Sequence, residues 1–426
     1  MHFQPRGFET DTTSMALNAR GVRFIPFLLR WFMFGVVNGI EETSPANAVA
    51  EAFAVAAERD SLRRLLAGLI AVLLCVGVQM VHSASLTSRP GAQDAVFTGK
   101  HLGYLMLSLI CAWFASRVTS VWLQQHSGRL FWIVVVMLVA LFVPGIGSRI
   151  NGAQRWLRLG SLSLQPSELG RIVLPLVAAT LLTKLRATSG FLVQTIPATL
   201  WPLLIVLPLV AIEPDLGATV FLAAGYVLAL FIGGWPLRYF VASAALAIPA
   251  GASLMILRPY QMDRITGFMA AWRDLRQAPW QIRQSLLSLG SGGLEGTGIG
   301  SGWQKLSYLP EANTDFVFAV IGEELGLIGT ITVCLIWMAV FIVGRAVLKH
   351  LPRTSFEWIF GTTLLLQLVL QAMANIAVVT ALVPPKGVPH PFISYGGTNL
   401  LVSLTAVGLI IGMSRTRPAS SDMDVR

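Results

Sequence analysis

Charged side chains are scarce in this sequence. Asp, Glu, Lys and Arg make up 12% of its 426 residues, whereas roughly 25% is usual in a soluble domain, and hydrophobic residues make up 54%. This composition excludes an ordinary water-soluble protein. A helix needs about 17 to 25 apolar residues to cross a bilayer core, and ten such runs lie near residues 65–83, 102–118, 130–148, 170–185, 196–212, 216–234, 237–257, 315–345, 356–382 and 398–414. The sequence therefore predicts an all-α integral membrane protein, a bundle of ten transmembrane helices.

Cysteine and histidine are also sparse, with three and six residues. The cysteines all lie inside apolar runs without CxxC spacing, which argues against a disulfide framework and a zinc site. No HxxxH or HExxH pair is present, so we expect no metal site built from protein side chains. A basic helix interleaved with aromatic residues is missing too. The formal charge of +10 therefore indicates loop topology and anionic lipid headgroups, with no nucleic-acid partner.

The basic residues define the organisation of the chain. Lys and Arg concentrate in alternate short loops, which places both termini in the cytoplasm. Phe24–Ile40 is apolar but contains Pro26 and Arg30, and it lacks the small-residue cleavage site of a signal peptide, so we interpret it as an interfacial stretch. The predicted parts are an N-terminal cytoplasmic or interfacial extension (1–61), a membrane domain (62–415) and a cytoplasmic tail (416–426).

One basic loop departs from this alternation. Arg149, Arg155 and Arg158 lie in a loop that the alternation places outside. Such a loop is a candidate anion site, although topological noise and interfacial anchoring by Arg side chains are alternatives. Pro166 followed by Glu168 indicates the start of a helix, whose dipole would also attract an anion.

The longest outside loop, residues 258–314, exceeds the roughly 12–15 residues beyond which loops are usually functional or disordered. Its segment Trp280–Gly290 has apolar residues at i, i+4 and i+7, which predicts an amphipathic helix on a surface. Residues 290–302 include seven glycines, so the backbone could approach a ligand closely. A flexible hinge is the alternative, and the absence of a GK[ST] ending argues against nucleotide binding.

Two further outside segments carry polar groups. IEPDLG, residues 212–217, separates two apolar runs, and PPKGVP, residues 384–389, is incompatible with a regular helix. Asp315 opens the eighth apolar run, while Glu323 and Glu324 lie inside it, where a carboxylate is costly. The shared outside location predicts one polar cavity holding both bases and carboxylates. Either an enzyme that joins lipid-linked sugars or a transporter of a lipid-linked anion would suit it, and the clustering at one face favours the enzyme.

Four segments also carry a resemblance to a known family. They are NGAQRWLRLGSLSLQPSEL, EPDLGA, QSLLSLGSGGLEGTGIGSGWQKLSYLPEANTDFVFAVIGEELG and PPKGVPHPFISYGGTNLL. In this order they resemble the SEDS family (shape, elongation, division and sporulation), which includes FtsW, RodA and SpoVE, over roughly residues 62–415. The form QKLxYLPEA is most similar to the FtsW branch. The resemblance implies ten transmembrane helices with a large extracytoplasmic loop (258–314) between the seventh and eighth.

The resemblance implies a peptidoglycan glycosyltransferase that polymerises lipid II. The 4-hydroxyl of one disaccharide would attack the anomeric carbon of another, releasing undecaprenyl diphosphate. The family's essential aspartate corresponds to Asp315 through LPEANTDF, and the implied role is general base on that hydroxyl. Substrate-binding positions implied by a weaker match are Arg155, Arg158, Gln165, Glu168, Arg171, Asp215, Gln284, Lys305, Glu311 and Ser394.

The resemblance also implies a cellular location, partners and cofactors. The expected location is the bacterial inner membrane, as a multi-pass protein at the division septum, with a class B penicillin-binding transpeptidase and other divisome proteins as partners. No cofactor is expected to be tightly bound, and a divalent cation such as Mg²⁺ could assist at the diphosphate. Lipid II flipping, a divisome scaffold and a RodA-like role in elongation are the alternatives.

The chain departs from the family pattern at four positions. Asn313 stands where His is usual, which puts a proton relay through that His in doubt. Glu213 replaces the commoner Gln before PDLG, and Trp280 stands where GY is usual. Arg171 replaces a common Lys, which keeps the charge but changes the donor geometry.

Overall fold

The computed structural model describes residues 45–85, 92–150, 153–159, 162–189, 195–213, 215–256, 259–303, 309 and 311–415. The interfacial stretch expected at Phe24–Ile40, the C-terminal tail and Lys305 lie outside these residues. The chain divides into two units, Met1–Ala56 and Ala57–Arg426. The elements that matter for the site belong to the second unit.

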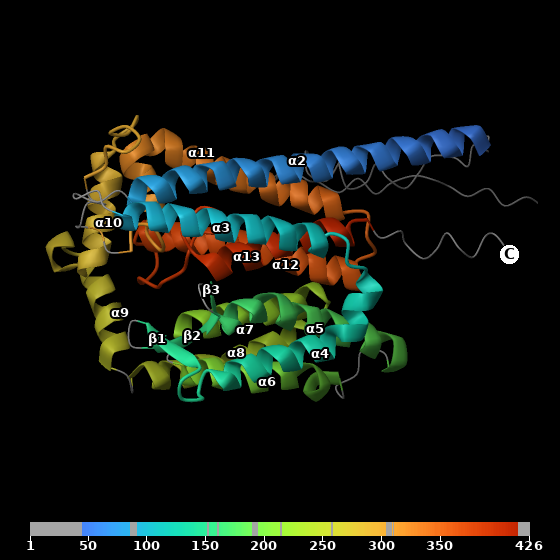
Figure 1. Cartoon of the computed structure of the whole chain (residues 1–426). Coiled ribbons are helices and arrows are strands. Elements are labelled where there is room, and N and C mark those ends of the chain that lie inside the picture. Colours follow the sequence, from blue (N-terminus) through green and yellow to red (C-terminus); the bar gives the residue numbers. More distant parts are fainter. Residues whose placement is uncertain are drawn as a thin grey trace, which may run out of the picture. The chain divides into compact units, whose positions relative to one another are not determined.

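The described residues are mostly helical (Figure 1). Their α-helices are α2 (Pro45–Ser85), α3 (Ala92–Ala115), α4 (Ser120–Ala140), α5 (Pro166–Ser189), α6 (Thr195–Ile212), α7 (Leu216–Ile232), α8 (Leu237–Ile256), α9 (Pro259–Ala271), α10 (Trp280–Ser291), α11 (Val317–Leu348), α12 (Phe356–Val379) and α13 (Gly397–Met413). A 3₁₀ turn, η1 (Leu275–Gln277), lies between α9 and α10. Each of the ten expected apolar runs overlaps one of these helices.

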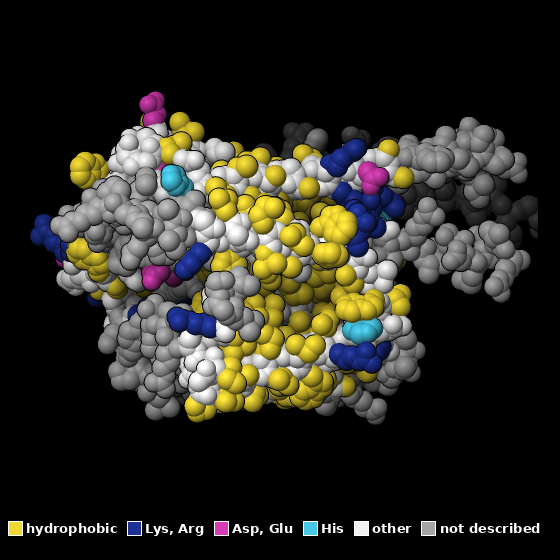
Figure 2. Space-filling model, in the orientation of Figure 1, with side chains coloured by type: hydrophobic (Ala, Val, Ile, Leu, Met, Phe, Trp, Pro, Cys, Tyr) yellow, Lys and Arg dark blue, Asp and Glu magenta, His cyan; other side chains and the backbone are white. Residues whose placement is uncertain are grey.

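Several helices have the character of membrane spans. Judged by length and composition, four described segments could cross a bilayer: Ala56–Ala84, Ser120–Ala140, Val317–Leu348 and Phe356–Val379. Figure 2 shows hydrophobic side chains over the middle of one face, with Lys and Arg gathered on both sides of this band. A mostly helical, multi-pass membrane protein is therefore confirmed, while ten crossings stay a prediction.

The helices pack around a continuous apolar core. α3 lies against α13, α5 packs on both α4 and α7, and α12 contacts α11 and α13. Among the described residues, the largest fully buried aromatic side chains are Phe131, Tyr226, Trp337, Phe360 and Phe392. Together these contacts bring α5, α7, α11, α12 and α13 into one framework, from whose ends the polar segments project.

One helix begins earlier than the hydropathy indicated. The third apolar run was expected at 130–148, but α4 covers Ser120–Ala140. Thr119 starts the helix, because its hydroxyl accepts a hydrogen bond from the Trp122 amide at 3.3 Å. Beyond the helix the chain turns, with Gly145 at a φ of 89°.

A small antiparallel sheet follows α4, which an all-α prediction did not include. It has the strand order β1 (Gly147–Ile150), β2 (Ala153–Leu159) and β3 (Leu162–Leu164). In β2 the side chains alternate, with Leu157 buried and Arg158 exposed. The sheet leads directly into α5, which begins at Pro166 as the sequence indicated.

The eighth apolar run is not one straight helix. α11 is interrupted at Gly326, whose φ of 64° and ψ of −161° are not helical. The 22 residues that follow, up to Leu348, form a helix of about 33 Å, which suffices to cross a bilayer core. The apolar run expected at 315–345 thus falls on a helix that is broken at Gly326, and Glu323 and Glu324 precede the break, outside the longer piece.

Candidate active site

Residues from three separate segments meet around Asp215. Asp215 caps α7, since its Oδ1 accepts a hydrogen bond from the Ala218 amide at 3.0 Å. Its Oδ2 lies 3.4 Å from Nη1 of Arg155 in β2. Gln165, just before α5, donates to the same Oδ2 from Nε2 at 3.3 Å. The sheet and two helix starts thus bring together three of the residues that the sequence selected.

Glu213 adds a second carboxyl group to this cluster, just beyond the end of α6. Its side chain is 2% exposed, and neither carboxyl oxygen has a hydrogen-bond partner among the described residues. Burial, and secondarily the charge of Asp215, raise the pKa of Glu213 to about 8, although Arg155 opposes the shift. Glu213 therefore carries a proton at neutral pH. A protonated Glu resembles the Gln expected there, because both are neutral and can donate a hydrogen bond.

Two further cations connect this cluster to Asp315. Arg264 in α9 donates from Nη1 to the carbonyl oxygen of Pro385 at 3.4 Å. Burial and the Arg264 charge lower the pKa of Lys386, while Asp215 acts in the opposite direction. Burial, followed by the charge of Glu311, raises the pKa of Asp315 to about 7, against the effect of Arg264. The charges of Asp215 and Arg264 thus influence the pKa of Lys386, and that of Arg264 also influences the pKa of Asp315.

The turn that carries Asp315 is held by its backbone. The carbonyl oxygen of Asn313 accepts from the Tyr395 amide at 2.8 Å, and that of Thr314 accepts from Ser394 Oγ at 2.5 Å. Asn375 Nδ2 donates to the carbonyl oxygen of Asp315 at 2.7 Å. The sequence selected Ser394 but missed Asn375, because Asn375 lies within an apolar run and belongs to none of the four polar segments.

The carboxyl group of Asp315 lies against the proline-rich segment, residues 384–395. A Cβ atom added to Gly387 would lie 2.8 Å from Asp315 Oδ2, which is closer than side-chain carbons normally come. Gly387 therefore leaves the space that this carboxyl group occupies.

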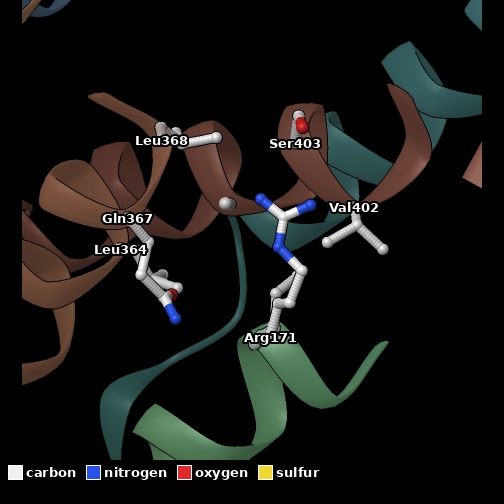
Figure 3. A pocket seen from close by; sticks show the side chains of 8 residues that line it. Arg171, Leu364, Gln367, Leu368, Val402 and Ser403 are labelled. Atoms are coloured by element: carbon white, nitrogen blue, oxygen red, sulfur yellow. The ribbon is translucent and has the colours of Figure 1, made fainter. Parts of the chain in front are cut away.

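Glu168 and Arg171 belong to a different cluster, between α5, α12 and α13. Arg171 Nη1 donates to Glu168 Oε2 at 2.5 Å and to Asn399 Oδ1 at 3.2 Å, and Nη2 donates to Gln371. Gln371 in turn donates to the Pro389 carbonyl oxygen at 2.8 Å. In Figure 3 the guanidinium group points away from α5, toward Leu368 and Ser403. Arg171 therefore ties α5 to the helices that support the proline-rich segment.

The remaining selected residues occupy other positions. Arg158 is exposed on β2. Glu311 is exposed and accepts from Thr314 Oγ1 at 2.9 Å. Gln284 is buried on α10, the helix expected at Trp280–Gly290, which packs against α11 and α12. The buried face of α10 includes two polar residues, Ser285 and Ser288, besides the apolar Ile282. Ser285 is satisfied there, because its Oγ donates to the Val379 carbonyl oxygen at 2.7 Å.

The glycine-rich segment packs against the break in α11. Thr297 and Gly298 donate backbone hydrogen bonds to the carbonyl oxygens of Glu323 and Glu324 at 2.9 and 3.1 Å. The Gly300 amide donates to Glu324 Oε2 at 3.0 Å. Gly296 has a φ of 86°, and a Cβ atom there would lie 2.2 Å from the Glu324 carbonyl oxygen. The glycine-rich segment therefore comes close to the backbone of α11 in the same chain.

The two glutamates have structural partners. Glu323 Oε1 accepts from the Trp303 amide at 2.6 Å. Ser83, near the end of α2, donates to Glu324 Oε1 at 2.6 Å. Buried carboxylates need such donors, and these contacts explain the positions of both glutamates without a catalytic role.

The described residues do not form a cage for a metal ion. No group of three or more His, Cys, Asp or Glu side chains converges within them. We derive no step that depends on a divalent cation.

Fold and site together define a helical membrane protein with a charged site on the segments that join its helices. The family model of FtsW, RodA and SpoVE, described as cell cycle protein, matches residues 63–418. The chain belongs to this family.

Individual relatives support the same family assignment. The chain is 38% identical to a "Probable peptidoglycan glycosyltransferase FtsW" of Coxiella burnetii, covering 80% of this chain and 92% of the relative. A protein of the same name from Methylococcus capsulatus is 36% identical, covering 82% and 88%.

Solved structures show the same fold. A peptidoglycan synthase complex, described as coordinating polymerization and crosslinking, contains a chain with a TM-score of 0.66 and 25% identity, covering 82% of this chain and 96% of that one. The rod shape determining protein RodA of Thermus thermophilus has a TM-score of 0.59 and 26% identity, covering 82% and 95%.

Proposed function

We propose that this protein is a peptidoglycan glycosyltransferase that polymerises lipid II into glycan strands. The observation that carries the proposal is Asp315, whose pKa of about 7 suits a general base near neutral pH and is influenced by the charge of Arg264. The names of the curated relatives support the same activity.

In the proposed mechanism, the carboxylate of Asp315 accepts the proton of the acceptor's 4-hydroxyl. The hydroxyl oxygen then forms a bond to the anomeric carbon of the donor disaccharide, and the bond from that carbon to the diphosphate oxygen breaks. Undecaprenyl diphosphate leaves with the electron pair. Arg155, Arg264 and Lys386 neutralise its charge, the usual role of preorganised cations in phosphate departure.

The other selected residues support substrate binding in this proposal. Gln165 and Asp215 orient Arg155, and Ser394 holds the turn of Asp315. Glu168 and Arg171 connect α5 to α12 and α13. Arg158, Gln284, Lys305 and Glu311 are proposed as peripheral contacts of the substrate.

We further propose ten membrane crossings, with residues 1–61 and 416–426 in the cytoplasm and residues 258–314 outside. The site then faces the exterior of the inner membrane, at the division septum. The likeness to a chain of a peptidoglycan synthase complex supports a class B transpeptidase as the partner that cross-links the strand.

The test is a polymerisation assay with the purified protein, its transpeptidase partner and fluorescent lipid II. Asp315→Asn keeps the size of the side chain but removes the base, so we expect glycan products to fall at least about 10²-fold, the usual contribution of general-base catalysis. Unchanged products from a folded variant would exclude this role of Asp315. If the wild type makes no glycan but moves lipid II between leaflets of proteoliposomes, the protein is a transporter instead.

A further inference from the structure

Asn375 is a buried amide in α12, a helix of mostly apolar residues. Its side chain is 0% exposed, and it follows Gln367 and Gln371 at intervals of four residues, so all three lie along one face of the helix. Polar side chains inside an apolar helix are costly unless they make hydrogen bonds. The contacts of Asn375 therefore indicate what the residue is for.

Its side-chain nitrogen bridges two loops. Nδ2 of Asn375 donates to the carbonyl oxygen of Asp315 and to that of Val388, both at 2.7 Å. These bonds use both hydrogens of the amide. Its Oδ1 has no partner among the described residues. The two hydrogen bonds that Asn375 Nδ2 donates thus join the turn of Asp315 to the proline-rich segment.

The same segment holds the two preceding carbonyl groups. Ser394 and Tyr395 donate to the carbonyl oxygens of Thr314 and Asn313. Ser394 Oγ in turn accepts from the His390 amide at 2.7 Å. No side chain caps the start of α11. Within the turn, the amides of Thr314 and Phe316 donate to the Glu311 carbonyl oxygen at 3.1 and 3.2 Å, while α12 and the proline-rich segment supply the bonds that fix the turn relative to the rest of the bundle.

We propose that Asn375 is a positioning residue for Asp315, which rests on the proposed role of Asp315 as general base. Asn375 does not touch the substrate in this proposal. It sets the backbone from which the carboxyl group projects, and a misplacement of about 1 Å can reduce a catalytic rate about 10²-fold. Substrate binding depends on other residues, so the loss falls on kcat rather than KM.

The test compares Asn375→Asp with Ser285→Ala in the full-length protein with its transpeptidase partner. Asn375→Asp keeps the shape but replaces the donor with an acceptor. Ser285 is a matched control, because it is also 0% exposed and donates to α12, at the Val379 carbonyl oxygen, without touching residues 313–315. We measure kcat and KM for lipid II and the melting temperature of each variant in detergent.

We expect Asn375→Asp to lower kcat about 10²-fold with KM changed less than about threefold, while Ser285→Ala leaves kcat within about threefold. Equal losses of kcat in the two variants at equal melting temperature would overturn the proposal. If Asn375→Asp does not fold, Asn375→Ala, which removes both donors without adding a charge, replaces it, and a kcat at the control level overturns the proposal equally.

Wild type and Asp315→Asn run in parallel separate this inference from the proposed function. If Asp315→Asn loses activity while Asn375→Asp behaves as the control does, only the positioning role is wrong. If the wild type forms no glycan, or Asp315→Asn retains full activity, the proposed function fails and the inference falls with it.

Discussion

Asp315 and Glu213 both have raised pKa values, but their environments assign them different roles. Burial is the largest cause of the shift at Asp315, followed by the charge of Glu311, while Arg264 opposes it, and the resulting pKa of about 7 allows this carboxyl group to exchange a proton near neutral pH. Glu213 has a pKa of about 8 because burial dominates, so it stays neutral at pH 7. The same side-chain chemistry thus supplies one group that can act as a base and one that acts as a hydrogen-bond donor.

For Asp315 we expect a dependence of rate on pH. The carboxylate is the active form of a general base, so kcat/KM should rise about tenfold per pH unit below pH 7 and level off above it. The measurement is the polymerisation rate between pH 5.5 and about 8.5. Glu311→Gln removes a charge that raises the pKa of Asp315, so its midpoint should move to lower pH. A flat profile, or an unmoved midpoint, contradicts the assignment.

For Glu213 we expect a dependence of stability on pH. Its pKa rises from 4.5 to about 8 on folding, so the folded state binds more protons than the unfolded state in that interval, and the free energy of unfolding falls as pH rises. The melting temperature should fall more steeply between pH 4.5 and about 8 in the wild type than in Glu213→Gln, with a difference of about 2–4 °C. Parallel curves would show that Glu213 does not titrate as described.

At the scale of elements, the break in α11 explains where the glycine-rich segment and the two glutamates lie. Gly326 ends one helical piece and begins another, and the carbonyl groups of Glu323 and Glu324 become free to accept from Thr297 and Gly298. A continuous helix would use those carbonyls internally. The break therefore creates the surface on which the loop before Asp315 is built.

Gly326→Ala tests this account. A Cβ atom there would lie 2.4 Å from the Leu294 carbonyl oxygen and require a φ of 64°, so we expect a loss of at least about 2 kcal/mol in the free energy of unfolding. Gly128→Ala in α4 is the control, because a Cβ atom there meets nothing within 4 Å, and Ala favours the helix by about 1 kcal/mol. Thermal unfolding in detergent compares them, and equal stability of the two variants would refute the constraint at Gly326.

At the scale of the whole molecule, the site is assembled from segments far apart in sequence. Arg155 meets Asp215 across 60 residues, and Asn375 meets Asp315 across another 60. Each contact depends on how α5, α7, α11 and α12 pack. The packing of the helix bundle thus brings polar segments that are distant in sequence close together.

The sequence alone determined the helical membrane class, the start of α5 at Pro166 and the turn before α7, because hydropathy, proline and capping residues act over a few neighbouring positions. The family motifs selected Asp315 and Asp215. The small sheet, the break at Gly326 and the contacts of Asn375 were decided by tertiary structure. Their cause is contact between segments that no local pattern connects: hydrogen bonds between distant backbones, and burial that raises the pKa of a carboxyl group only when other helices exclude water from it.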